Sequence, residues 1–340
     1  MKNSKYIISS LLISFSLTFQ SCNQIFEEVP SNDKGSIFEN FWQNFQDDYA
    51  LFEERGIEWN EIYAQYRPLV NFNTTDEALF GILSEMIKPI EDGHVALMAP
   101  GIGAFDANPY FRDRIEDNLF DLDLIVNNYL EPGYKQNGHK FVYGKIKNHN
   151  MAYLHFDVFR KESVKLDDLL REFAQVDSYI IDLRHNNGGD VSLCFSFLGR
   201  FTEEKKLFLS SKTKNGKGAN DYTAWFDWHL NPSGKFLDKH VYILTDRYTV
   251  SAAERMVMAA KTVPKVLIVG DTTNGTFGTK ISRELANGWF YSYSIQKVKM
   301  FDGQSYEGIG LPPDIYVKNE PEEMKDGRDS VLEKVFLQNQ

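Results

Sequence analysis

One stretch of the chain, from Val241 to Met258, restricts the possible folds more than any other. It reads VYILTDRYTVSAAERMVM, in which a β-favouring run is followed by a short polar break and then by strong helix formers. This order predicts a buried strand, a tight turn and a helix. Ser251 then stands at or near the helix N-terminus, where unpaired backbone N–H groups and the helix dipole can hold a developing negative charge.

A serine in this place has two explanations. The ordinary one is an N-cap, with Glu254 three residues later completing a capping box. The second is a nucleophile whose oxyanion intermediate is stabilised at the helix N-terminus. Caps are far more common than nucleophiles, so other parts of the chain have to decide between the two.

The composition is that of a globular protein, with 42% hydrophobic residues in a chain of 340. The formal net charge is −11 and the basic residues are scattered, which argues against nucleic-acid binding. The histidines form no H-x-x-x-H pair and the cysteines no cluster, so the sequence predicts no metal site and no other cofactor.

The first 22 residues are typical of a secretory signal. A positively charged start precedes an apolar run from Tyr6 to Phe19, which is too short to span a bilayer comfortably. The run ends near Cys22 in a pattern that resembles a bacterial lipoprotein signal, in which the cysteine is lipidated. We therefore expect a lipid-anchored protein of the cell envelope, with residues 23–34 as a polar tether. Ordinary signal cleavage near Cys22 is the alternative.

Residues 35–100 are expected to form an N-terminal helical domain. Aromatic residues recur there at three- and four-residue spacing, which predicts three short helices packed through one aromatic face. Residues 101–320 are expected to form an α/β core, and residues 321–340 a C-terminal tail. The first strand of this core is expected in FDLDLIVNNYL at 120–130, where apolar and polar residues alternate at the start.

Strands alternate with helices between residues 160 and 270. This pattern predicts a mixed α/β fold with a partly parallel sheet and crossover helices. Helices are expected at 164–176 and 191–201, and strands at 140–146, 151–156, 178–183, 206–212, 219–226, 241–245, 266–270, 281–285 and 289–298.

Four separated segments combine glycines with polar residues. They are DLRHNNGG at 182–189, TVSAAE at 249–254, GDTTNGTFG at 270–278 and EGIGLPPD at 307–314. Each of the first three follows a predicted strand. The paired glycines of the first segment let backbone N–H groups face a ligand without obstruction by side chains.

In this order, the four segments resemble the S41 serine peptidases, which include the carboxy-terminal processing proteases and the tricorn core protease. The resemblance covers residues 36–318. It implies an endopeptidase that needs no cofactor and acts on a peptide or protein substrate. Ser251 would be the nucleophile, His94 its base and Glu307 the group that orients His94, while the backbone N–H groups of Gly188 and Ala252 would bind the oxyanion.

The resemblance leaves the base open to alternatives. The processing proteases use a lysine 25 residues after the serine, where this chain has Thr276, although Lys280 follows closely. The tricorn-like enzymes have a serine directly before the histidine, and this chain has Gly93. His185, in the first of the four segments, is a competing base.

A second class of function is a non-catalytic binding protein, because retinoid-binding relatives share the fold. In that case the region of Trp225, Trp228 and Trp289 would line an apolar pocket. The family's PDZ domain is not expected, because about fifty residues separate His94 from the strand near 141. The sequence does not indicate an oligomeric state.

Overall fold

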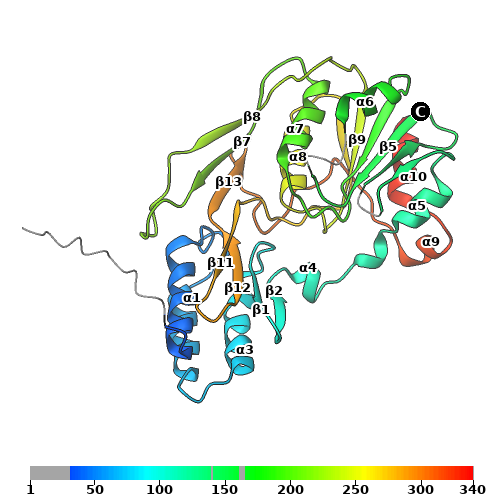
Figure 1. Cartoon of the computed structure of the whole chain (residues 1–340). Helices are drawn as coiled ribbons and strands as arrows, with labels where there is room; N and C mark the ends of the chain where they lie inside the picture. Colours follow the sequence, from blue (N-terminus) through cyan, green and yellow to red (C-terminus); the bar gives the residue numbers. More distant parts are fainter. Residues whose placement is uncertain (1–30, 139–140, 161–164, 340) are drawn as a thin grey trace, which may run out of the picture.

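The computed structural model describes residues 31–138, 141–160 and 165–339. The expected signal with Cys22, and most of the tether, lie outside the described residues. The chain folds into two regions (Figure 1), and a cavity lies between them. We call them the core lobe, built on a seven-stranded sheet, and the amino lobe, built from the first three helices and a four-stranded sheet.

The sheet of the core lobe is mostly parallel. Its strand order is β14-β10-β9-β6-β5-β4-β3, with the first five strands parallel and the last two antiparallel. The strands are β3 (Lys135–Gln136), β4 (Phe141–Lys145), β5 (Met151–Phe156), β6 (Ser178–Asp182), β9 (His240–Thr245), β10 (Val266–Gly270) and β14 (Ile315–Tyr316).

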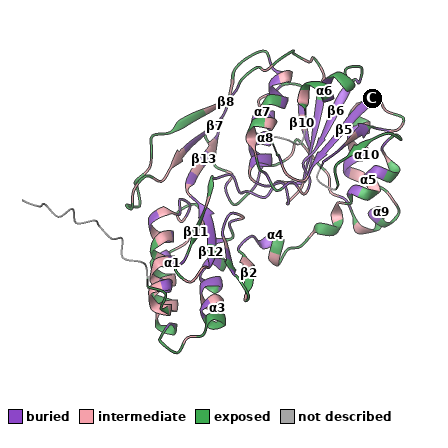
Figure 2. Ribbon diagram, viewed as in Figure 1, coloured by how far each residue is buried: buried purple, intermediate pink, exposed green. Residues whose placement is uncertain are grey.

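Helices cover both faces of this sheet, which explains its continuous apolar strand sequences. In β6, Tyr179 and Ile181 face one hydrophobic cluster and Ile180 faces another. The helices α6 (Leu166–Glu172), α7 (Val191–Leu198) and α8 (Ala252–Ala260) pack on the first face, and α5 (Leu122–Asn128) and α10 (Ser330–Gln338) on the second (Figure 1). Figure 2 shows that the central strands are buried. The predicted mixed α/β fold with crossover helices is confirmed.

The amino lobe is not made of helices alone. Its helices α1 (Lys34–Asp48), α2 (Trp59–Tyr66) and α3 (Asp76–Ile87) pack on a sheet of order β11-β12-β1-β2. Two of these strands, β1 (Ala96–Ala99) and β2 (Gly103–Asp106), follow the helices, while β11 (Lys280–Glu284) and β12 (Phe290–Ser294) come from the far end of the chain. The aromatic helix face needs a second apolar layer, and β12 supplies it through Tyr291 and Tyr293.

Two segments have a different structure from the one expected. Most of the run at 120–130 forms α5 instead of a strand, and the Asp121 side chain caps this helix by accepting Leu124 N–H at 3.1 Å. Residues 321–339 are not a tail: α9 (Pro321–Lys325) and α10 form there, and Val331, Leu332 and Val335 of α10 are buried against the sheet.

The run expected as one strand at 289–298 is divided between two sheets. It forms β12 and then β13 (Gln296–Met300), with Ile295 between them. β13 belongs to a three-stranded sheet with β7 (Lys206–Thr213) and β8 (Phe226–Leu230). The strand expected at 219–226 is β8, which begins at Phe226 and so lies further along the chain than expected.

The connection between the lobes is short. Between β1 and β4 the described residues form β2, α4 (Pro109–Arg112), a short 3₁₀ turn, α5 and β3, and no PDZ domain. The 3₁₀ turn between α4 and α5 lies at Asp117–Leu119, and the other 3₁₀ turns of the described residues lie at Arg67–Leu69, Lys88–Ile90 and Gly199–Phe201. No helix in the described part of the chain is long and apolar enough to cross a bilayer.

Candidate active site

The carboxyl ends of three parallel strands bring the predicted site loops together. β6 ends at Asp182, β9 at Thr245 and β10 at Gly270, and parallel strands end at the same edge of a sheet. A cavity of about 670 Å³ opens beside these loops, between the lobes. Its lining residues are Gly93, His94, Asp106, Phe111, Val158, Asn187, Gly189, Val191, Val250, Ser251, Ala252, Arg255, Gly278, Thr279 and Lys280.

Ser251 has a backbone conformation unlike that of an ordinary N-cap. Its φ is 60° and its ψ is −114°, whereas N-cap residues are normally extended. A positive φ is strained for a residue with a Cβ, and such strain collects at functional sites. A serine on a strained strand-to-helix turn is the arrangement that exposes the nucleophile of α/β-hydrolases.

Glu254 does more than complete a capping box. Its buried carboxylate accepts the N–H of Ser251 at 3.1 Å, of Gly275 at 2.7 Å and of Thr276 at 2.9 Å. Thr276 O also accepts the Ser251 N–H, at 3.1 Å. Burial raises the pKa of Glu254 to about 7. This carboxyl therefore ties the Ser251 peptide to the turn at residues 275–276.

His94 reaches the cavity from the amino lobe. Its backbone N–H donates to Asp92 Oδ1 at 2.8 Å, and its ring Nδ1 lies 3.3 Å from Ser294 Oγ. Tyr49 in turn donates its hydroxyl to Asp92 Oδ2 at 3.0 Å. Burial lowers the pKa of His94 to about 4, so the ring is neutral at pH 7 and can accept a proton.

Glu307 is not bonded to His94, which corrects the expected triad. Its carboxylate accepts Phe277 N–H at 3.2 Å and lies 3.4 Å from the Arg55 guanidinium. Burial, and then the nearby Asp92, raise its pKa well above the ordinary value. These contacts hold Glu307 at the glycine turn, and the side chain beside His94 Nδ1 is that of Ser294.

The first glycine of the pair is not the expected oxyanion donor. Gly188 packs tightly against the nucleophile, since a Cβ there would lie 2.8 Å from Ser251 Cβ. Its N–H, however, donates to Asn186 Oδ1 at 2.8 Å. Gly189 lines the cavity instead. Ala252 also lines the cavity as the first residue of α8, where a backbone N–H has no intrahelical acceptor.

Gly93 is a steric requirement of this site. A Cβ at this position would lie 2.7 Å from Thr276 Oγ1, 2.9 Å from Asn108 Nδ2 and 3.0 Å from Asn274 Oδ1. The Gly93 N–H also donates to Thr276 Oγ1 at 3.2 Å. The serine that tricorn-like enzymes have before their histidine would not fit here unless these neighbours moved.

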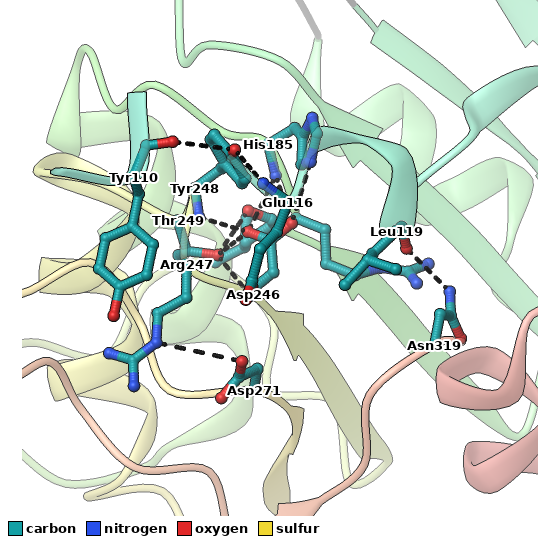
Figure 3. A network of polar contacts seen from close by, with 12 residues as sticks. Tyr110, Glu116, Leu119, His185, Asp246, Arg247, Tyr248, Thr249, Asp271 and Asn319 are labelled. Carbon is teal, nitrogen blue, oxygen red and sulfur yellow. Dashed lines mark hydrogen bonds and ion pairs between the residues drawn. The ribbon is translucent and has the colours of Figure 1, made fainter. Parts of the chain in front are cut away.

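The other predicted bases lie in different places. Lys280 lines the cavity at the start of β11. His185 does not line it, and its ring packs on Tyr248 at 4.4 Å, with Nε2 3.5 Å from Asp246 Oδ2 (Figure 3). Among the described residues, no group of three or more metal-ligating side chains is gathered.

The tryptophans considered for an apolar pocket do not form one. Trp289 is buried in the core of the amino lobe, while Trp228 lies on β8 and Trp225 directly before it. None of the three lines the cavity between the lobes. This separation removes the sequence argument for a tryptophan-lined ligand site.

Sequence reasoning missed Ser294, Arg55 and Asp92. Ser294 ends β12, a strand whose last four residues are all buried, and the sequence carries no sign that its hydroxyl meets His94. Arg55 and Asp92 look like surface charges in the sequence, but both are largely buried in the structure. Asp92, two residues before a candidate catalytic histidine, is the one that local sequence could have indicated.

Comparisons with known proteins agree with this architecture. The model of peptidase family S41 matches residues 150–317, and that of the tricorn protease C1 domain matches residues 30–88. The chain is 24% identical over 179 residues to the carboxy-terminal processing protease CtpA of Bacillus subtilis (strain 168), which is 51% of this chain and 36% of CtpA. The chain thus matches about a third of the length of this relative.

Two solved structures resemble nearly the whole chain. A candidate peptidase from Parabacteroides merdae ATCC 43184 superimposes with a TM-score of 0.81 and 28% identity, covering 90% of this chain and 96% of that one. Mature CPAF complexed with lactacystin gives a TM-score of 0.68 at 11% identity, over 89% and 97% of the two chains, which is a likeness of fold alone. The chain belongs to peptidase family S41.

Proposed function

We propose that this chain is a serine endopeptidase in which Ser251 is the nucleophile and His94 the general base. The observation that carries the proposal is the strained Ser251, at φ 60° on the N-terminus of α8, on the same cavity as His94. Membership of the S41 family and the relation to carboxy-terminal processing proteases support it. The substrate is a peptide or protein that enters the cavity between the lobes.

In the proposed reaction, Ser251 Oγ attacks the scissile carbonyl carbon while its proton passes to His94. The imidazolium then gives this proton to the departing amine as the C–N bond breaks, and water hydrolyses the acyl-enzyme by the same route. The negative charge on the carbonyl oxygen is held by the N–H groups of Ala252 and Gly189, at the positive end of the α8 dipole.

Ser294 takes the orienting task in this proposal. If His94 Nδ1 carries the proton and donates it to Ser294 Oγ, 3.3 Å away, then Nε2 is left to accept the proton of Ser251. A hydroxyl stabilises an imidazolium less than a carboxylate does. Burial lowers the pKa of His94, and the negative charge of the nearby Asp92 opposes this lowering. Glu307 would act indirectly, by holding the turn at Phe277.

Labelling with a fluorophosphonate probe tests the nucleophile and its base together. We expect the wild type to be labelled, Ser251→Ala to show no labelling, and His94→Ala to be labelled at a rate lower by about 10²- to 10⁴-fold. Lys280→Ala, at another position on the wall of the cavity, should retain its rate. Loss in Lys280→Ala with retention in His94→Ala would instead establish a serine–lysine dyad. A wild type that is never labelled would contradict the peptidase and favour a binding protein.

We also propose that the protein is anchored to the bacterial cell envelope by lipid on Cys22. The support is the pattern of residues 1–22, with its charged start and short apolar run. Full-length protein should partition into detergent from cell extracts, and Cys22→Ser should move it to the aqueous phase. Equal partition of the two proteins would contradict the anchor.

A further inference from the structure

Asp246 stands where the two loops of the candidate active site meet. It directly follows β9, and both of its carboxylate oxygens lie 3.2 Å from the backbone N of His185, in the loop after β6 (Figure 3). The same carboxylate accepts Tyr248 N–H at 2.9 Å and lies 3.2 Å from the Thr249 hydroxyl. One partly buried side chain thus bonds to the glycine loop and to the loop that carries Ser251.

The residues around Asp246 have backbone conformations that need support. Two of the four described non-glycine residues with positive φ, His185 at 56° and Ser251 at 60°, lie on these two loops. Such conformations persist only where the surroundings over-determine them. Asp246 accepts the backbone N–H of the strained His185. A second hydrogen bond joins the same two loops, because Val250 N–H donates to Asn186 O at 3.0 Å.

The network also reaches the wall of the cavity. The Tyr248 hydroxyl accepts Glu116 N–H at 2.8 Å and donates to Tyr110 O at 3.0 Å. The Tyr248 ring packs edge-on against Phe111 at 5.1 Å, and Phe111 lines the cavity. A shift of the Asp246 carboxylate would therefore disturb the glycine loop, the nucleophile loop and one wall of the substrate site together.

We propose that Asp246 is a positioning residue for acyl transfer, which sets the distance between Ser251 and the backbone donors of the 185–189 loop. The proposal rests on the serine peptidase function proposed above. Asp246 does not line the cavity and so does not touch the substrate. It acts through its bonds to the His185 and Tyr248 peptides, because oxyanion donors are effective only when they are fixed before the charge develops.

The test compares Asp246→Asn with Asp271→Asn in the full chain. Asp271 is a matched control: it follows the neighbouring strand β10 and pairs with Arg247 and Lys318, but it makes no bond to the His185 loop (Figure 3). Asp246→Asn keeps the shape of the side chain but turns one acceptor oxygen into a donor that faces backbone N–H groups. We expect its fluorophosphonate labelling rate to fall by about 10- to 100-fold, and Asp271→Asn to label like the wild type.

Two readouts separate positioning from general stability. With peptide substrate, Asp246→Asn should lower kcat while KM changes by less than about threefold, since the lost geometry matters most in the transition state. Should Asp246→Asn not fold, Thr249→Val carries the test, because it removes the hydroxyl between Asp246 and Leu183 O and should lower the labelling rate without unfolding the protein. Wild-type rates in the folded variants would overturn the proposal.

His185→Gly tests which part of His185 matters. Glycine keeps the N–H that Asp246 binds and adopts positive φ without strain, so labelling should stay within about threefold of the wild type. A fall as large as that of Asp246→Asn would show that the His185 ring matters, and would overturn the proposal. A wild type that is not labelled would mean instead that the serine peptidase function has failed.

Discussion

The two lobes hold the candidate catalytic groups in different ways. The core lobe presents Ser251 on a strained turn between a buried strand and a buried helix, with its peptide bonded to Glu254 and Thr276. The amino lobe presents His94 from a loop ahead of a short strand, over a core of tilted aromatic rings such as Phe45 and Tyr293 at 4.8 Å.

Polar contacts with a single turn of the core lobe fix the amino lobe near the site. Gly93 donates to Thr276 at 3.2 Å, Asn108 to Asn274 at 3.2 Å, and Arg55 to Gly275 O at 3.3 Å. The geometry of Ser251 is thus set within the core lobe, where Glu254 also holds Gly275 and Thr276, while the position of His94 depends on the contacts across this junction. Substitutions on the amino-lobe side of the junction, such as at Arg55, should therefore act on the candidate base before they act on the candidate nucleophile.

The largest effect is expected from Arg55→Met. Arg55 is a largely buried cation that faces Glu307 and Asp92 and donates to Glu91 O at 2.6 Å. Its removal leaves buried carboxyls without a compensating charge, so the free energy of unfolding should fall by about 3 to 5 kcal/mol. Urea denaturation measures this loss.

The control for Arg55 is Arg171→Met, which removes an exposed arginine from an i,i+3 pair with Asp168. It should change the free energy of unfolding by less than about 0.5 kcal/mol. Similar losses in the two variants would mean that the junction is no more important than a surface ion pair.

The next effect is a pH dependence caused by Glu254. Burial raises its pKa from an ordinary value of 4.5 to about 7 in the folded protein, so the folded state binds the proton more tightly. The stability that Glu254 contributes is therefore full below pH 4.5 and is lost as the pH rises to about 7. The difference in unfolding free energy between wild type and Glu254→Gln should shrink by about 3 kcal/mol over this window. A difference that is flat with pH would contradict the burial of this carboxyl.

Much of the fold could be predicted because its signals are local. The strands β5, β6, β9 and β10 are continuous apolar runs, since helices cover both sheet faces. The sequence misled where local and tertiary preferences differ. The alternating start of α5 reads as a strand until Asp121 is recognised as a cap, and the single β-favouring run around Ile295 contains a change of sheet that only packing determines.

The candidate site could be predicted in part, for a related reason. The loops of Ser251 and His94 were found because glycines and a strand-to-helix change mark them. The partners of Glu307 and the role of Ser294 could not be found, since contacts such as Glu307 with Arg55 join residues 252 positions apart. The two candidate oxyanion donors, Gly188 and Gly189, are adjacent in the sequence. The structure distinguishes them, because the Gly188 N–H donates to Asn186 and Gly189 lines the cavity.

The smallest effect is expected at the periphery of the junction. The Tyr222 hydroxyl, ahead of β8, donates to Ala50 O of the amino lobe at 2.9 Å. Tyr222→Phe removes this one bond and should lower the unfolding free energy by about 1 kcal/mol, with the labelling rate unchanged. A large fall in labelling would show that lobe alignment also depends on contacts far from residues 274–276.

The most direct test of a nucleophile and a base supplied by different lobes is a crystal structure of the fluorophosphonate adduct. We predict phosphorus bonded to Ser251 Oγ, with a phosphonyl oxygen about 2.7 to 3.1 Å from the N atoms of Ala252 and Gly189. The His94 ring should then face the modified oxygen from the amino lobe, with its Nδ1 still beside Ser294. An adduct in which Lys280 Nζ contacts that oxygen and His94 stays remote would contradict the account.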